Sequence, residues 1–215
     1  MKGLLITFEG GEGAGKSTQV VRLAERLRGA GRVVRLVREP GGTAIGEEIR
    51  HLLKHSPNSG GMTAATELLL MNASRAQLVG EVLRPSLAAG EVVLCDRYSD
   101  STLAYQGYGR GLPLDQVAAV VDFAVEDTRP NLTLLLEVPP AVSAARLAAR
   151  QAGRPAVRDR IEAEAAEFFA RVERGFAELA AREPRRIRRL DASGSEDEVA
   201  AAIWATVAPL LETAP

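Results

Sequence analysis

Residues 10–17 of the chain read GGEGAGKS, which fits the phosphate-binding pattern of Gly, four residues, Gly, Lys and then Ser or Thr. Glycines at alternating positions let consecutive backbone N–H groups curl around a phosphate, because glycine adopts φ > 0 without steric cost. A buried strand is predicted before the loop at residues 4–8, and a helix after it at residues 17–27. In this setting we expect Lys16 to meet the β and γ phosphates of a nucleotide and Ser17 to meet a Mg²⁺ ion.

Length and composition narrow the class of protein. The chain has 215 residues and a formal net charge of −1, which fits one α/β domain with small-molecule partners. Such a charge gives no field that would draw the whole protein to nucleic acid or to a membrane. One cysteine, Cys95, and two histidines, His51 and His55, cannot form a disulfide framework or a zinc cluster. We recognise no signal peptide or long apolar span, so we expect a cytoplasmic protein.

The remaining sequence alternates strands with helices. Further strands are predicted at residues 33–37, 91–95, 132–138 and 186–190. Helices are predicted at residues 43–53, 63–89, 113–126, 140–151, 161–182 and 196–211, and Pro85 is expected to kink or shorten the second of them. Residues 99–111 are predicted to form a short helix and a glycine-rich turn. This alternation predicts a three-layer α/β fold, a five-stranded parallel sheet flanked by helices. We expect a single domain over residues 1–215, with a mobile lid at about 150–160, where glycine, proline and charged residues occur together.

Four sequence motifs follow one another in an order found in a known family. They are GGEGAGKS at residues 10–17, REPGGT at 38–43, DRYSDSTLAYQG at 96–107 and DRIE at 159–162. The chain thereby resembles the bacterial thymidylate kinases over essentially its whole length. The first motif is shared by many NTPases, but the second and third together are far more specific. The resemblance implies a P-loop nucleoside monophosphate kinase fold and a homodimer. It also implies phosphoryl transfer from MgATP to dTMP, giving dTDP for dTTP biosynthesis.

The resemblance assigns the phosphoryl donor to the phosphate loop. The expected ATP-binding residues are Gly10, Gly11, Glu12, Gly13, Ala14, Gly15, Lys16, Ser17 and Thr18. Ser17 is expected to ligate Mg²⁺ directly and Asp96 through water, since this ion prefers hard oxygen ligands. The alternative for Asp96 is a helix-cap or salt-bridge carboxylate.

Arginines recur at about four-residue intervals in and beside the predicted lid, at positions 146, 150, 154, 158 and 160. On a helical path these side chains would project from one side. At least one should reach the transferring phosphate, because phosphoryl transfer requires the charge on the migrating group to be neutralised. The alternative is a salt-bridged helix face. The residues expected to act in catalysis are Lys16, Asp96, Arg97, Arg150, Arg154 and Arg158.

The resemblance assigns the acceptor phosphate to Arg97 and Arg50, with Glu39 nearby. A guanidinium suits this role because it grips phosphate oxygens bidentately. The alternative for Arg50 is a surface ion pair with Glu47. Glu12 matches the family's carboxylate that binds the 3′-hydroxyl of the acceptor.

The thymine base is assigned to a separate set of side chains. Arg75, Thr102 and Gln106 match polar contacts to the ring edge, and Tyr105 matches the ring that crowds the 2′ position of the sugar. Met71 departs from the family, which usually has a stacking phenylalanine there. Its thioether can still cover an aromatic ring, and the alternative is a core side chain. The full expected substrate-binding set is Glu12, Glu39, Arg50, Met71, Arg75, Arg97, Ser101, Thr102, Tyr105 and Gln106.

Other functions remain open at this stage. A kinase for dUMP or for a broader deoxynucleotide set would use the same motifs. Because dUMP lacks only one methyl, which an apolar pocket discriminates by about 1–3 kcal/mol, we expect dUMP to be a weak substrate in any case. A nucleotide-driven switch or partitioning ATPase would hydrolyse nucleotide without dTMP, and the chain lacks the Asn-Lys pair of a guanine-specific switch. The arginines between residues 182 and 189 lack interleaved aromatics, so we interpret them as solvated surface and expect no nucleic-acid partner.

Overall fold

The computed structural model describes residues 3–56, 59–151, 160, 161 and 163–213. Its sheet has five parallel strands in the order β2-β3-β1-β4-β5. The strands are β1 (Leu4–Glu9), β2 (Val34–Arg38), β3 (Val92–Asp96), β4 (Leu132–Glu137) and β5 (Ile187–Asp191). The predicted α/β sheet is therefore confirmed, and each predicted strand agrees with the structure to within one residue at either end.

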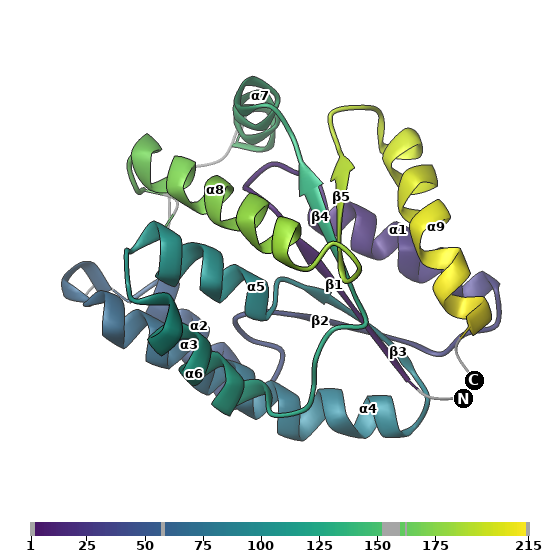
Figure 1. The fold of residues 1–215 in the computed structure, drawn as a ribbon, viewed down its shortest axis with the longest axis horizontal. Helices are drawn as coiled ribbons and strands as arrows, with labels where there is room; N and C mark the ends of the chain where they lie inside the picture. Colours follow the sequence, from purple (N-terminus) through teal and green to yellow (C-terminus); the bar gives the residue numbers. More distant parts are fainter. Residues whose placement is uncertain (1–2, 57–58, 152–159, 162, 214–215) are drawn as a thin grey trace.

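Helices cover both faces of this sheet (Figure 1). They are α1 (Lys16–Gly29), α2 (Ala44–Lys54), α3 (Ala64–Leu78), α4 (Arg84–Ala88), α5 (Ser99–Thr102), α6 (Leu114–Val125), α7 (Pro140–Gln151), α8 (Ala166–Arg182) and α9 (Glu196–Thr213). Shorter segments are η1 (Ser59–Gly61), η2 (Val79–Leu83) and η3 (Leu103–Gly109), of which the last two are π-helical. None of the helices in the described ranges is long and apolar enough to cross a lipid bilayer.

Two cores form because successive side chains of a strand point to opposite faces. From β1, Ile6 and Phe8 pack with residues of α1 and α9. Leu5 points the other way and joins residues of α3 and α6. In β4, Leu134 belongs to the first core, whereas Leu135 packs with α8 on the second face. Because β1 and β4 are apolar on both faces, each forms a nearly continuous apolar run in the sequence, and this run allowed both to be predicted as buried strands.

The helix predicted at residues 63–89 continues past its proline. It consists of α3, the π segment η2 and α4 in direct succession. Pro85 is the second residue of α4 and directly follows the π segment η2, so the hydrogen bond that proline cannot donate falls where the helical bonding pattern changes. The chain therefore keeps a helical path up to Ala88 instead of breaking.

Two predicted boundaries were wrong. In the stretch predicted as a short helix and a glycine-rich turn, residues 99–109 are helical throughout, as α5 and η3, and the turn is limited to residues 110 and 111. Gly109 serves close packing there, since a Cβ on it would lie 2.7 Å from the ring of Phe168 in α8. Helix α8 begins at Ala166, not at residue 161, and turns precede it. In that preceding stretch, Arg160 and Glu164 are held in ion pairs with side chains of other elements.

The prediction of a solvated arginine cluster was also wrong at Arg186. This side chain is only 18% exposed and pairs bidentately with the buried Asp100 of α5, at 2.7 and 2.8 Å. A buried carboxylate requires such a countercharge. The arginine thereby ties the start of β5 to the segment that follows β3.

The carboxyl ends of β2, β3 and β1 meet at one edge of the sheet. Asp96 lies level with Phe8 of β1 and with Arg38 of β2 in the strand register. Ligands of open parallel sheets collect at this edge. The phosphate loop, the REPGGT loop and the DRY segment are therefore brought together by strand order alone.

Candidate active site

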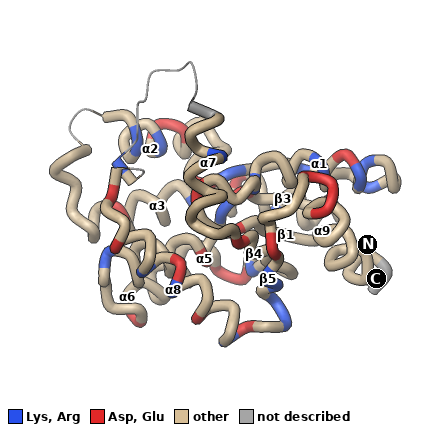
Figure 2. Tube along the Cα trace, turned by 90° about the horizontal axis from the view of Figure 1, so that it is seen from above, with Lys and Arg blue, Asp and Glu red and all other residues tan. Residues whose placement is uncertain are grey.

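A cavity of about 700 Å³ lies at this edge of the sheet. The predicted residues that line it are Glu12, Gly13, Ala14, Gly15, Lys16, Ser17, Thr18, Glu39, Arg50, Met71, Arg75, Asp96, Arg97, Ser101, Thr102, Tyr105 and Gln106. Gly10 and Gly11 line a neighbouring cavity beneath the loop. Viewed from above, basic and acidic residues both lie around the strand ends, with α2 and α7 bordering this region (Figure 2).

The phosphate loop has the backbone that its glycines predict. Gly13 and Gly15 adopt φ values of 70° and 83°, which are left-handed. The Lys16 ammonium is buried and donates to the carbonyl oxygens of Gly10 at 3.1 Å and Gly11 at 2.7 Å. Burial, together with the charge of Arg97, lowers the pKa of Lys16 to about 8. The ammonium is thus held at the loop, where a bound anion would favour the protonated form of Lys16 and raise its pKa.

Ser17 and Asp96 form the candidate metal position. The Ser17 hydroxyl donates to Asp96 Oδ2 at 2.6 Å, so the two predicted Mg²⁺ contacts lie side by side. Within the described ranges no three His, Cys, Asp or Glu side chains gather to hold a metal. Magnesium is commonly bound by one or two protein oxygens completed by phosphates and waters, and this pair fits that pattern.

Arg97 lies across the cavity from the loop in an unusual backbone conformation, with φ of 68°. Its guanidinium donates to Glu12 Oε1 at 3.1 Å and to Ser101 Oγ at 3.2 Å, and lies 5.1 Å from the ring centroid of Tyr105. Arg50 reaches the same cavity from α2, and it donates to the carbonyl oxygen of Pro40 at 2.9 Å. Two guanidinium groups therefore line the space in front of the phosphate loop.

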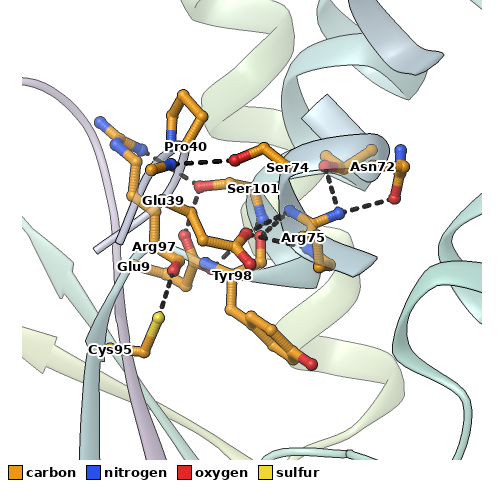
Figure 3. Close-up of polar contacts among 12 residues, drawn as sticks. Glu9, Glu39, Pro40, Asn72, Ser74, Arg75, Cys95, Arg97, Tyr98 and Ser101 are labelled. Carbon is orange, nitrogen blue, oxygen red and sulfur yellow. Dashed lines mark hydrogen bonds and ion pairs between the residues drawn. The ribbon is translucent and has the colours of Figure 1, made fainter. Parts of the chain in front are cut away.

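A buried ion pair between Arg75 and Glu39 also lines the cavity, and its polar contacts are drawn in Figure 3. Arg75 and Glu39 lie 2.7 Å apart with side chains that are 3% and 4% exposed. Arg75 also donates to Asn72 Oδ1 at 2.8 Å, Thr102 Oγ1 at 2.9 Å and the Tyr98 carbonyl at 3.0 Å. With so many partners, the guanidinium is held in one orientation. One carboxylate oxygen of Glu39 is buried without a hydrogen-bond partner among the described residues.

The remaining base-site candidates also reach the cavity. Met71 is half-buried and lines it from α3, which leaves both of its predicted roles possible. Tyr105 is buried, with a hydroxyl that has no hydrogen-bond partner in the described part of the chain. Gln106 is 2% exposed and donates through Nε2 to Glu67 at 2.6 Å. The structure thus brings together every described residue of the predicted base pocket.

The lid arginines are only partly described. Arg154 and Arg158 lie outside the described residues, as does the side chain of Arg150. Arg146 lines the cavity and donates to the carbonyl oxygen of Gly194 at 3.2 Å. Arg160 is ion-paired with the buried Glu67. Arg146 and Arg160 therefore have different surroundings, although the spacing of the arginines predicted that they project from one side.

Sequence reasoning missed Glu9, the last residue of β1. Its carboxyl is fully buried and accepts hydrogen bonds from the backbone N–H groups of Tyr98 at 2.8 Å and Ser101 at 3.2 Å, and from Ser101 Oγ at 2.5 Å. Burial first, and then the charge of Asp100, raise the pKa of Glu9 to about 7. The available signal was a charged residue that ends an otherwise apolar strand immediately before the loop.

These features define a class of protein. A glycine-rich loop follows the central strand of a doubly wound parallel sheet, and it faces a cavity lined by guanidinium groups that suit a second phosphate. This is the arrangement of a P-loop kinase that acts on a small phosphorylated acceptor.

Comparison with known proteins gives the family. The family model described as thymidylate kinase matches residues 8–203. A thymidylate kinase of Synechococcus sp. (strain JA-2-3B'a(2-13)) is 50% identical over 211 residues, covering 98% of this chain and 97% of the relative. One from Deinococcus radiodurans is 49% identical over 206 residues, covering 96% and 97%. The crystal structure of thymidylate kinase from Ehrlichia chaffeensis aligns with a TM-score of 0.76 at 31% identity, covering 97% of this chain and 99% of that one.

The chain therefore belongs to the thymidylate kinase family. It is an enzyme that phosphorylates dTMP at the expense of ATP, a step in the biosynthesis of dTTP. The fold and the transfer from ATP to dTMP, two of the expectations drawn from the four sequence motifs, are confirmed.

Proposed function

We propose that the cavity carries out this transfer with the donor on the phosphate loop and the acceptor between the two arginines. The loop N–H groups and Lys16 hold the donor phosphates. Ser17 and Asp96 hold Mg²⁺, which when bound neutralises phosphate charge. The observation that carries the proposal is the convergence of Lys16, Arg97 and Arg50 on one cavity. Phosphoryl transfer is accelerated mainly by positioning two anions in line and by stabilising their charge.

On the acceptor side, Arg97 and Arg50 bind the monophosphate. Arg97 suits this role because its side chain is held by Glu12 and Ser101 and so needs little reordering when it binds phosphate. Glu12, the residue of the donor loop that pairs with Arg97, binds the 3′-hydroxyl. Glu39 acts through Arg75, whose orientation it maintains.

The base lies against Met71, Arg75, Thr102 and Gln106, and Tyr105 lies beside the sugar. Support comes from their shared lining of one cavity and from the positive charge of Arg75, which favours a ring carbonyl beside it. The same pocket accepts dUMP as a weak substrate, since the missing methyl removes only about 1–3 kcal/mol of apolar contact.

Three further assignments complete the proposal. One or more of Arg150, Arg154 and Arg158, in the lid predicted at about residues 150–160, stabilise the transferring phosphoryl group. The chain works as a homodimer. It acts in the cytoplasm, which is consistent with its single cysteine being free and buried.

Binding measurements on Arg50→Ala test the placement of the acceptor. A charge-assisted hydrogen bond to phosphate is worth about 1.5–3 kcal/mol, so the Kd for dTMP should rise at least about tenfold. The Kd for ATP should stay within about twofold, because the donor phosphates lie on the loop. Equal weakening of both nucleotides would contradict the assignment. Glu47→Ala, which removes a neighbouring charge on α2, serves as the matched control.

A further inference from the structure

Glu67 is a buried carboxylate to which the roles above assign no function. It stands in the first turn of α3 with no exposed surface. Gln106 Nε2 donates to its Oε1 at 2.6 Å. Arg110 binds it with two nitrogens, Nε at 3.1 Å and Nη2 at 2.9 Å, and Arg160 is a further ion-pair partner. The carboxylate therefore lies directly behind Gln106, one of the residues that line the cavity.

The Glu67 carboxylate is held in its ionised form. Burial alone would raise the pKa of Glu67, but hydrogen bonds from Arg110, Gln106 and Arg160 outweigh burial, and the pKa is lowered. An ionised carboxylate accepts hydrogen bonds and donates none. Only the NH₂ end of the Gln106 amide can therefore face Glu67.

This constraint determines which atom Gln106 offers to a ligand. Because the amide is planar, with nitrogen and oxygen on opposite sides, fixing Nε2 on Glu67 leaves the carbonyl oxygen as the acceptor available to the cavity. Arg75 lines the same wall and brings a fixed positive charge to it, while its N–H groups are held by Glu39, Asn72, Thr102 and the Tyr98 carbonyl. The wall thus combines a positive charge, which favours a ring carbonyl, with an acceptor. Thymine matches it with its O4 acceptor and N3–H donor, whereas cytosine has a donor amino group and an unprotonated N3 at these positions.

We propose that Glu67 is a positioning residue for base selection, which holds the Gln106 carbonyl toward the N3–H of a thymine or uracil base and so disfavours cytosine nucleotides. Glu67 does not touch the substrate and acts only through the amide of Gln106. The inference rests on the proposed placement of the base beside Arg75 and Gln106.

The test compares kcat/KM for dTMP and for dCMP within one preparation of each variant, so that losses of folded protein cancel in the ratio. In Glu67→Gln the new amide can donate to the oxygen of Gln106, which lets the Gln106 amide turn its NH₂ toward the cavity. The dTMP/dCMP ratio should fall by about tenfold, the equivalent of one misplaced hydrogen bond. Arg110→Gln is the matched control, because it removes an ion pair of Glu67 and leaves the bond to Gln106. It should keep the wild-type ratio.

A double variant, Glu67→Gln with Gln106→Glu, provides the rescue. It conserves the net charge of the cluster and returns an obligatory acceptor to the cavity wall, so the dTMP/dCMP ratio should recover to at least the wild-type value. The proposal is overturned if Glu67→Gln keeps the wild-type ratio, if Arg110→Gln lowers the ratio equally, or if the double variant stays as unselective as the single one. If dUMP did not compete with dTMP for binding to the wild-type protein, the proposed base pocket itself would be rejected.

Discussion

Replacing Glu9 by glutamine should change how the stability of this protein depends on pH. Glutamine has nearly the same shape, and its carbonyl can still accept from the backbone N–H groups of Tyr98 and Ser101. Its NH₂ can donate to Ser101 Oγ, since a hydroxyl both donates and accepts. The variant therefore keeps the local hydrogen bonds while it removes the titrating group.

The magnitude follows from the pKa of Glu9. Burial raises that pKa from 4.5 to about 7, and each pKa unit corresponds to about 1.4 kcal/mol, so the effect is on the order of 3 kcal/mol. Between these two values the native state keeps a proton that the unfolded chain releases. Raising the pH therefore lowers the free energy of unfolding. The contribution is fully present below about pH 4.5 and is lost as the pH rises through about 7.

Urea denaturation followed by circular dichroism from pH 4.5 to 8 measures this difference. The free energy of unfolding of wild type minus that of Glu9→Gln should fall by about 3 kcal/mol across the range. Glu25→Gln, a change at an exposed position of α1, should run parallel to wild type. If the Glu9→Gln and wild-type curves also ran parallel, Glu9 would titrate normally and the argument from burial would be refuted.

Substitutions at three further positions test other parts of the account. Lys16→Ala should keep the wild-type circular dichroism spectrum and lose at least about 10²-fold in kcat, because a positioned cation at the donor phosphates is removed, and near-normal turnover would reject the loop assignment. Met71→Ala should raise the KM for dTMP several-fold with the KM for ATP nearly unchanged, and Met71→Phe should stay active, whereas equal changes for both substrates would indicate a core role instead. Arg186→Met should lower the free energy of unfolding by about 3–5 kcal/mol, because it leaves Asp100 buried without its countercharge, and a loss below about 1 kcal/mol would show that the pair is solvated.

Much of the fold could be predicted because its signals are local. The glycine spacing of residues 10–17 and the apolar runs of β1 and β4 depend on neighbouring residues only. Helix α2 is a further example, since Thr43 caps it by accepting from the Gly46 N–H at 3.0 Å, as expected of a threonine before a periodic apolar stretch. The glycines of residues 107–111 misled the prediction because Gly109 is required for contact with α8, which no local pattern reveals.

The unpredicted residues have partners that are distant in the chain. Glu9 binds Tyr98 and Ser101, and Glu67 binds Gln106 and Arg110, so the residues near either glutamate in the sequence do not reveal its partners. Parallel strand order creates these contacts, because it brings segments that are far apart in the sequence to the same sheet edge. Motif reasoning could name residues that line the cavity, but it could not name the buried carboxylates that bond to them.

A coupled assay of ADP release tests the central claim most directly. Purified protein is supplied with ATP and Mg²⁺, and ADP formation is measured with dTMP, with dUMP, with dCMP and with no monophosphate. The account predicts rapid ADP formation with dTMP, a kcat/KM for dUMP that is lower by about 10–200-fold, and only background release without an acceptor. ADP release at the same rate with and without dTMP would contradict it, because the protein would then be a nucleotide hydrolase and not a kinase for this acceptor.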